Sequence, residues 1–258
     1  MASININGLS LPYKQLSLLD LINQNKYSIF GISETHLSIK EGRFLNKEIP
    51  TYTSFWSSYT NSRQAGVGIF IHHSISKYIA RSHNFNGHIV GVDLNFRNNP
   101  IRLLQVYFPT AEKKQLRKEV QEEIIKLCLD TTYKIILMGD LNSVPNPRQD
   151  RLPPKKSSIP ESQLIKFLIS QQFKDTYRLF FPKKSKFTFS RADSYSRIDQ
   201  IWTNISVTLL DYTDIVSELQ LESDHQLITL ELTLQISQSL PTKQKSRKCF
   251  QWKKCNKE

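Results

Sequence analysis

The sequence predicts a mixed α/β domain in which helices cover the sheets. Short runs rich in β-branched residues outnumber the amphipathic helical segments, and the two kinds of segment alternate along the chain. With 258 residues and 39% apolar side chains, the chain can bury one large core or two small ones. Its apolar runs are all shorter than the ~18 residues that a membrane span requires, so we expect no membrane partner.

The first half of the chain is predicted to consist mainly of strands. A helix is expected after residue 10, because Pro12 stands near a helix start and Tyr13, Leu16 and Leu19 recur at helical spacing. The expected strands are Ala2–Asn7, Tyr27–Ile32, Val67–Ile71, Ile89–Phe96 and Ile101–Tyr107.

The second half is predicted to contain two helices and several more strands. Glu112–Asp130 is a helix with Leu116, Val120 and Ile124 on one face, and a second helix is expected at Glu161–Gln171. Between them, Ser143–Pro160 contains five prolines and is predicted to be a long loop of the kind that carries function. The expected strands are Lys134–Met138, Phe187–Phe189, Arg197–Trp202, Val207–Val216 and Gln226–Leu234.

The net charge of +12 is unevenly distributed. Residues 241–258 hold seven Lys or Arg and one Glu, so we expect a domain over 1–240 followed by a basic, disordered tail over 241–258. A basic protein is attracted to polyanions, of which nucleic acid is the commonest. Three cysteines are too few for a disulfide framework, so we expect an intracellular location, and Cys249 and Cys255 lack the further ligands of a zinc site. The Lys/Arg run over 243–257 is typical of a nuclear-localisation segment, so within the cell we expect the nucleus.

Five polar clusters follow predicted buried strands. Carboxylates and a histidine at strand ends can converge on one end of a sheet, where they can hold a hard cation and activate water. The clusters are Asn5-Ile6-Asn7, Ser33-Glu34-Thr35-His36, Gly139-Asp140-Leu141-Asn142, Arg197-Ile198-Asp199 and Ser223-Asp224-His225.

Each cluster alone has a simpler structural explanation. Gly139-Asp140-Leu141-Asn142 is also an ordinary turn, and Ser223-Asp224-His225 also suits the start of a strand. Glu34 is harder to explain in this way, because it directly follows an apolar strand and an ionised group there needs a partner.

Taken together, the motifs resemble the endonuclease/exonuclease/phosphatase (DNase I-like) superfamily, and within it the apurinic-type endonuclease domain of LINE-like retrotransposons. The resemblance extends from residue 3 to about 235. Besides the five clusters it rests on Gly66-Val67-Gly68-Ile69, Val106-Tyr107, Asp150-Arg151, Phe187-Thr188-Phe189 and Gln200-Ile201. It implies a four-layer sandwich of two mixed β-sheets flanked by helices, with the active site at one end of the sheets.

The resemblance also implies a Mg²⁺ cofactor, which Mn²⁺ can replace, and DNA as the partner of a monomeric enzyme. Glu34 would be the main metal ligand, with Asn7 and Asp224 beside it. Asp140 would orient and deprotonate the attacking water. Asp199 would pair with His225, whose ring would contact the scissile phosphate.

Further residues are implied to contact the substrate. Asn5, Tyr107 and Asn142 would hold phosphate oxygens, and Thr188 and Arg197 would contact the DNA. Thr110 would do so as well, although the family has an asparagine at this position.

The sequence therefore favours one function and leaves two alternatives open, in this order. The first is a Mg²⁺-dependent DNA endonuclease that nicks a phosphodiester, as in retrotransposon insertion. The second is a hydrolase of the same fold that acts on a lipid or inositol phosphate, and the third is a catalytically inactive nucleic-acid-binding module.

Overall fold

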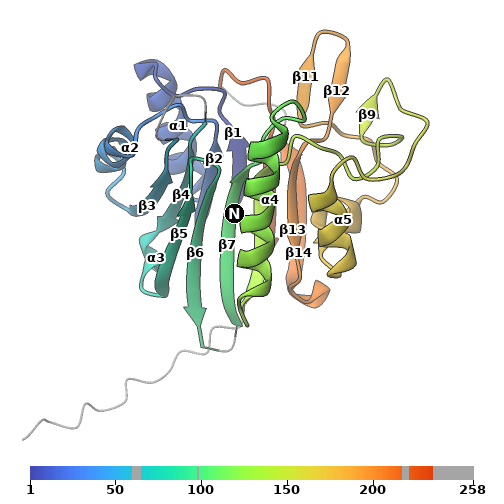
Figure 1. Cartoon of the computed structure of the whole chain (residues 1–258). Helices are drawn as coiled ribbons and strands as arrows, with labels where there is room; N and C mark the ends of the chain where they lie inside the picture. The colour runs from blue at the N-terminus through green and yellow to red at the C-terminus, as the bar shows by residue number, and fades with distance from the viewer. Residues whose placement is uncertain (60–64, 98, 217–220, 235–258) are drawn as a thin grey trace, which may run out of the picture.

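The computed structural model of the chain describes residues 1–59, 65–97, 99–216 and 221–234. These residues form two six-stranded sheets that pack face to face, with helices on both outer faces (Figure 1). This arrangement confirms the predicted four-layer sandwich. The predicted tail over 241–258 lies outside the described residues.

Both large sheets contain parallel and antiparallel pairs. β1 pairs with β2 in parallel, and β7 pairs with β8 in parallel, whereas the other pairs are antiparallel. The first sheet has the order β14 (Leu210–Val216), β15 (Leu227–Leu232), β1 (Ala2–Asn5), β2 (Ile29–Ser33), β4 (Val67–His72) and β3 (Tyr52–Ser57). The second has the order β10 (Lys174–Asp175), β13 (Asp199–Thr203), β8 (Lys134–Asp140), β7 (Asn99–Tyr107), β6 (Ile89–Phe96) and β5 (Ile79–Phe85).

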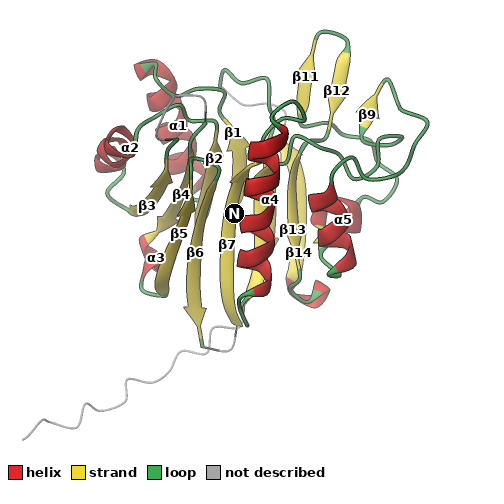
Figure 2. Ribbon diagram, in the orientation of Figure 1, coloured by secondary structure: helices red, strands yellow, loops and turns green. Residues whose placement is uncertain are grey.

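The helices cover the outer face of each sheet (Figure 2). α1 (Pro12–Asn25) and α2 (Ile39–Leu45) share an apolar cluster with the first sheet, and α4 (Lys114–Leu129) and α5 (Gln163–Ser170) share one with the second. The remaining short helices are α3 (His73–Ser76), α6 (Thr176–Phe180), and the 3₁₀ turns η1 (Asn46–Glu48) and η2 (Val207–Leu209). Among the described residues, no helix has the length and apolarity to cross a membrane.

The strands between the two helical layers bury both of their faces. In β8, Ile135 and Leu137 pack toward α4 and α5, whereas Ile136 and Met138 join the cluster between the sheets. This alternation follows from the two-residue period of a strand, because successive side chains point to opposite faces. It explains why residues 135–138 form an apolar run without polar interruptions.

Some elements differ from the sequence-based expectation. The predicted loop over 143–160 contains β9 (Arg151–Leu152), which pairs with β12 (Ser194–Ser196) and, through it, with β11 (Phe189–Arg191) in a small third sheet. The sequence patterns also missed α2, β3 and β5. β5 is an edge strand whose side chains are mostly exposed, so it lacks the apolar alternation that identifies a strand.

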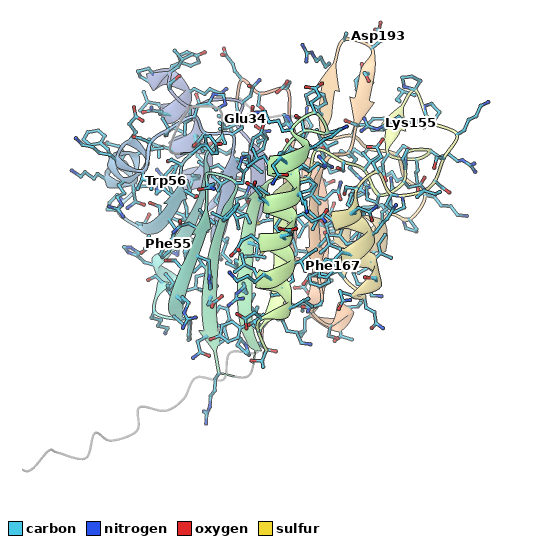
Figure 3. All side chains as sticks on the ribbon, in the orientation of Figure 1. Glu34, Phe55, Trp56, Lys155, Phe167 and Asp193 are labelled. Carbon is cyan, nitrogen blue, oxygen red and sulfur yellow. The ribbon has the colours of Figure 1, made fainter. Side chains whose placement is uncertain are left out.

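The strand register brings the polar clusters to one end of the sandwich. In the second sheet, Asp140 lies opposite Tyr107 on one side and opposite Asp199 on the other. In the first sheet, Asn5 lies opposite Ser33, the residue before Glu34. Figure 3 shows Glu34 at the end of the sandwich from which the β11–β12 hairpin projects, with Asp193 near its tip.

Candidate active site

A single buried amide joins the carboxylates of the two sheets. The Nδ2 atom of Asn5 donates to Oε2 of Glu34 at 2.8 Å and to Oδ2 of Asp140 at 3.0 Å. Both amide hydrogens of Asn5 are therefore directed at carboxylates, and its Oδ1 accepts from the backbone N–H of Asn7. Asn5 was predicted to hold phosphate oxygens, but in the structure it is fully buried and links Glu34 to Asp140.

The backbone at the strand ends adopts conformations that aim these side chains. Asn7, Glu34 and Asn142 all have φ between 43° and 56°, a region that non-glycine residues rarely occupy and that is enriched at functional sites. Gly139 has φ of +126°, and a Cβ there would lie 2.1 Å from the carbonyl oxygen of Val106. Only glycine fits before Asp140, which explains the Gly-Asp sequence.

The carboxyl group of Asp140 is almost completely buried. Its Oδ1 accepts from the backbone N–H of Asn142 at 2.8 Å, and its Oδ2 also accepts from the side chain of Asn142 at 3.4 Å. Burial and the neighbouring charge of Asp199 raise the pKa of Asp140 to about 7, despite the opposing charge of His225. A carboxylate with this pKa is suited to accept a proton near neutral pH.

His225 forms a buried ion pair with Asp199. The Nδ1 atom of His225 lies 2.8 Å from Oδ2 of Asp199, and the ring of Phe189 packs against the imidazole with 4.8 Å between centroids. Burial alone would lower the pKa of His225, but the charge and hydrogen bond of Asp199 outweigh it and raise the pKa to about 9. The imidazole is therefore positively charged at neutral pH.

Three predicted metal ligands lie around this buried core. Nδ2 of Asn7 donates to Oδ1 of Asp224 at 3.1 Å, and the same Asp224 oxygen lies 4.0 Å from Nε2 of His225. Glu34 is partly buried, with Oε1 3.6 Å from Nε2 of His36. Burial would raise the pKa of Glu34, but hydrogen bonds from His36, Asn5 and Tyr107 lower it overall. Glu34 is thus an anion at neutral pH.

Tyr107 contributes a neutral hydrogen-bond donor. Burial and the charges of Glu34 and Asp140 raise the pKa of Tyr107 strongly, so the phenol keeps its proton. The ring of His88 stacks on that of Tyr107, with 5.6 Å between centroids and 4° between planes, and His88 Nδ1 contacts the Tyr107 carbonyl oxygen at 2.6 Å. These contacts hold the ring in place.

Four further residues that were predicted to contact the substrate are Thr188, Asn142, Thr110 and Arg197, and three of them form side-chain hydrogen bonds to other protein groups. Thr188 is fully buried and its Oγ1 accepts from the backbone N–H of Asp199 at 2.9 Å, so it positions Asp199. Nδ2 of Asn142 donates to the carbonyl oxygen of Phe108 at 2.8 Å. Thr110 is half-buried three residues after Tyr107, and its carbonyl oxygen accepts from the backbone N–H of Lys113 at 3.1 Å.

The fourth, Arg197, contradicts the prediction of a DNA contact. Its side chain is 1% exposed and its guanidinium donates to both Asp150 and Asp175, with the shortest of these hydrogen bonds at 2.6 Å. All of its contacts are within the protein, so it is not positioned to reach a phosphate. It anchors the segment that precedes β13.

Sequence reasoning also missed one cation near the site. Lys14, in the first turn of α1, is 7% exposed and its Nζ donates to the carbonyl oxygen of Asn7 at 3.1 Å. Burial lowers the pKa of Lys14, although the charges of Glu222, Asp224 and Glu34 oppose this. The spacing of Asn7 and Lys14 in the sequence carries no signal for this contact, because it depends on how α1 begins.

The donor set fits a hard divalent cation. Glu34, Asn7 and Asp224 offer carboxylate and amide oxygens, the ligand atoms that Mg²⁺ and Mn²⁺ prefer. A second possible group, Asp140, Asp199 and His225, has ligand atoms within 4.8 Å of one another. The second group includes an imidazole whose Nδ1 atom pairs with Asp199, and an imidazole nitrogen suits Zn²⁺ better than Mg²⁺. The first group is therefore the better candidate, and the second fits a role in proton transfer and charge stabilisation.

Comparison with known proteins assigns the family. Residues 2–225 match the model of the endonuclease/exonuclease/phosphatase family. The chain belongs to this family, whose members are hydrolytic nucleases and phosphatases. It is also similar to a Xenopus laevis protein described as "Transposon TX1 uncharacterized 149 kDa protein", with 24% identity over 245 residues. The match covers 93% of this chain and only 18% of that relative.

Solved structures show the same fold at low sequence identity. The catalytic domain of Xenopus laevis APE2 superposes with a TM-score of 0.73 and 18% identity, over 90% of this chain and 91% of that one. The Neisseria 3′ phosphatase NExo, bound to a product DNA hairpin, superposes with a TM-score of 0.73 and 18% identity. The match covers 91% of this chain and 100% of that one. An AP endonuclease from Archaeoglobus fulgidus superposes with a TM-score of 0.72 and 14% identity, and the match covers 91% of this chain and 100% of that one.

Proposed function

We propose that this protein is a Mg²⁺-dependent DNA endonuclease that nicks one strand by hydrolysing a phosphodiester, in the manner of LINE-type retrotransposons. The observation that carries the proposal is the linkage of Glu34 to Asp140 through Asn5, beside the Asp199–His225 ion pair. The net charge of +12 and the similarity to a transposon protein support DNA as the substrate.

The proposed mechanism uses each group in the protonation state that its surroundings favour. Asp140 accepts a proton from water as the water oxygen attacks phosphorus, and the bond to the leaving oxygen breaks on the opposite side. The imidazolium of His225 and the phenol of Tyr107 donate hydrogen bonds to the phosphoryl oxygens, on which negative charge increases. Asp199 keeps His225 charged and fixes its orientation.

The metal would be held by Glu34, Asn7 and Asp224. When bound, Mg²⁺ supplies positive charge that stabilises the phosphoryl and leaving oxygens. Asn5 contributes by fixing Glu34 relative to Asp140, so that the metal ligand and the general base keep a constant spacing.

Nicking of supercoiled plasmid tests this function. Wild-type protein with Mg²⁺ is expected to convert supercoiled plasmid to the relaxed form, and EDTA should abolish the conversion. Asp140→Ala should lower the rate about 10²–10⁴-fold, the usual contribution of a positioned base. The exposed Asp193→Asn is the matched control and should retain wild-type activity.

Two outcomes would overturn the proposal. Wild-type protein that binds plasmid in Mg²⁺ but never relaxes it would be an inactive binding module. Release of phosphate from a soluble inositol phosphate, without relaxation of plasmid, would assign the same site to a different phosphoester.

A further inference from the structure

A second groove lies on the helical face of the first sheet, outside the candidate active site. It has a volume of about 860 Å³ and is bordered by Gln15 of α1 and by residues from Ser38 to Lys47 of α2 and η1. α1 and α2 both pack on this face of the sandwich (Figure 1). None of the residues assigned to the proposed reaction lines this groove.

The groove carries excess positive charge. Lys40, Arg43 and Lys47 line it and are exposed, and none of them forms an ion pair with another described residue. The lining carboxylate, Glu41, accepts from the backbone N–H of Ser38 at 2.7 Å in a capping box that starts α2. The groove therefore has three cations and one carboxylate, and that carboxylate already accepts a hydrogen bond at the start of α2. This excess of positive charge favours binding of an anionic ligand.

An exposed aromatic ring lies among these cations. Phe44 is 64% exposed and Ile39 is 40% exposed, although both belong to a helix that buries Gly42 and Leu45 against the sheet. The Nζ atom of Lys47 lies 5.2 Å from the centroid of the Phe44 ring. Alternating cations and an accessible ring form the surface on which single-stranded nucleic acids stack their bases and place their phosphates.

The groove is close enough to the active site to contact the same DNA molecule. α2 starts after Ser38, four residues beyond Glu34, so their Cα atoms are at most about 15 Å apart. The seven residues of α2 extend over about 10 Å more. At about 3.4 Å per stacked nucleotide, these upper limits place the groove within about 7 nucleotides of Glu34 and thus of the scissile phosphate.

We infer that the groove between α1 and α2 binds a single-stranded segment of the DNA that flanks the cleavage position, with a base stacked on Phe44 and phosphates bound by Arg43 and Lys47. A single strand is preferred to a duplex because Phe44 can stack only on an unpaired base. This inference rests on the proposed function, since it extends the substrate of that site.

Binding experiments in EDTA test the inference without cleavage. Fluorescence anisotropy is measured for a blunt 14-base-pair duplex and for the same duplex with a 10-nucleotide single-stranded extension at either end. The variants are Phe44→Ala and the double variant Arg43→Gln/Lys47→Gln. A double variant with the same charge loss on exposed lysines of α4 and α5, Lys118→Gln/Lys166→Gln, is the control. Circular dichroism checks that each variant is folded.

The expected result is a selective loss of affinity for the extended DNA. Phe44→Ala should weaken binding of at least one extended duplex about 5-fold or more, and leave binding of the blunt duplex within about 2-fold. Arg43→Gln/Lys47→Gln should lower the slope of log affinity against log salt by about 1.4, the value for two single-strand phosphate contacts. The control variant should show neither effect.

Equal binding of the extended DNAs by the wild type and both groove variants would overturn the inference. The same conclusion would follow if the control variant lost as much affinity for the extended DNA as Arg43→Gln/Lys47→Gln. Polyglutamate serves as a polyanion without bases, and groove variants that lost binding of polyglutamate but not of DNA would also overturn the inference. Failure of the proposed nuclease function is distinguishable, because it would appear as a lack of plasmid nicking by the wild type in Mg²⁺ while the binding differences persisted.

Discussion

Replacing Asp199 with asparagine should make activity depend on pH in a specific way. The pKa of His225 is about 9, because the ion pair with Asp199 outweighs the effect of burial. Asp199→Asn keeps the size of the side chain and removes its charge. Burial then acts with less opposition, and the pKa of His225 should fall to its ordinary value of about 6.5 or lower.

The size of the effect follows from the protonated fraction of the imidazole. At pH 8, a pKa of about 9 leaves about 90% of His225 protonated, whereas a pKa of about 6.5 leaves about 3%. At pH 6 the corresponding fractions are nearly 100% and about 75%. The titration of His225 alone should therefore increase the ratio of wild-type to variant nicking rates about 20-fold between pH 6 and pH 8. Loss of the Asp199 charge should also lower the pKa of Asp140, which favours the variant at pH 6 and increases the ratio further.

The assay is single-turnover nicking of supercoiled plasmid in Mg²⁺ over this pH range, with Asp193→Asn as a control at the tip of the β11–β12 hairpin. The chemical shift of the His225 ring, followed by NMR during a pH titration, reports the pKa directly. A wild-type to Asp199→Asn ratio that stays constant from pH 6 to pH 8 would refute the reasoning, because it would mean that Asp199 does not hold the charge on His225.

Four other changes have defined consequences. Arg197→Met should lower the free energy of unfolding in urea by about 3–5 kcal/mol, because Asp150 and Asp175 remain buried without their cation, whereas a change below 1 kcal/mol would show that the pairs are weak. Gly139→Ala should lower the free energy of unfolding by about 1–3 kcal/mol and impair nicking, because the added Cβ would clash with the carbonyl oxygen of Val106. An unchanged melting temperature would contradict this clash. Tyr107→Phe should reduce kcat about 10²-fold with little change in KM, and a pure KM effect would argue against a transition-state contact. In EDTA, the free energy of unfolding of the wild type should fall as the pH rises from 6.5 to 9, because the pKa of His225 is higher in the folded than in the unfolded state. Asp199→Asn lacks the ion pair and should not show this fall. Parallel pH profiles of the unfolding free energy for the wild type and Asp199→Asn would be inconsistent with the ion pair.

Local sequence patterns predict the mixed α/β class and the polar clusters at strand ends, whereas the four layers and the location of the active site were implied by the resemblance to a known family. Apolar runs such as 135–138 predict buried strands, and a polar cluster after such a run must lie at a strand end. Once the register places Asp140 between Tyr107 and Asp199, the convergence follows. The edge strand β5 and the seven-residue α2 were missed because their burial patterns are weak or short.

The roles of individual polar residues were less predictable, because they depend on distant partners. Arg197 reaches Asp150 and Asp175, which are 47 and 22 residues away in the chain, so its burial leaves no local signal. Likewise, the hydrogen bond from Asn5 to Asp140 joins residues that are 135 positions apart in the sequence. Motif position alone assigned both residues to the substrate, whereas tertiary contacts direct them to other protein groups.

The central claim is that Glu34, Asn7 and Asp224 of the first sheet hold one divalent ion, beside the groups of the second sheet that carry out hydrolysis. The Mg²⁺ dependence of plasmid nicking by Glu34→Gln tests it most directly. Loss of the Glu34 charge should raise the Mg²⁺ concentration for half-maximal nicking about 10-fold or more, with part of the rate recovered at high Mg²⁺. A Glu34→Gln variant that nicks with wild-type Mg²⁺ dependence would contradict the assignment of this end of the sandwich as the metal site.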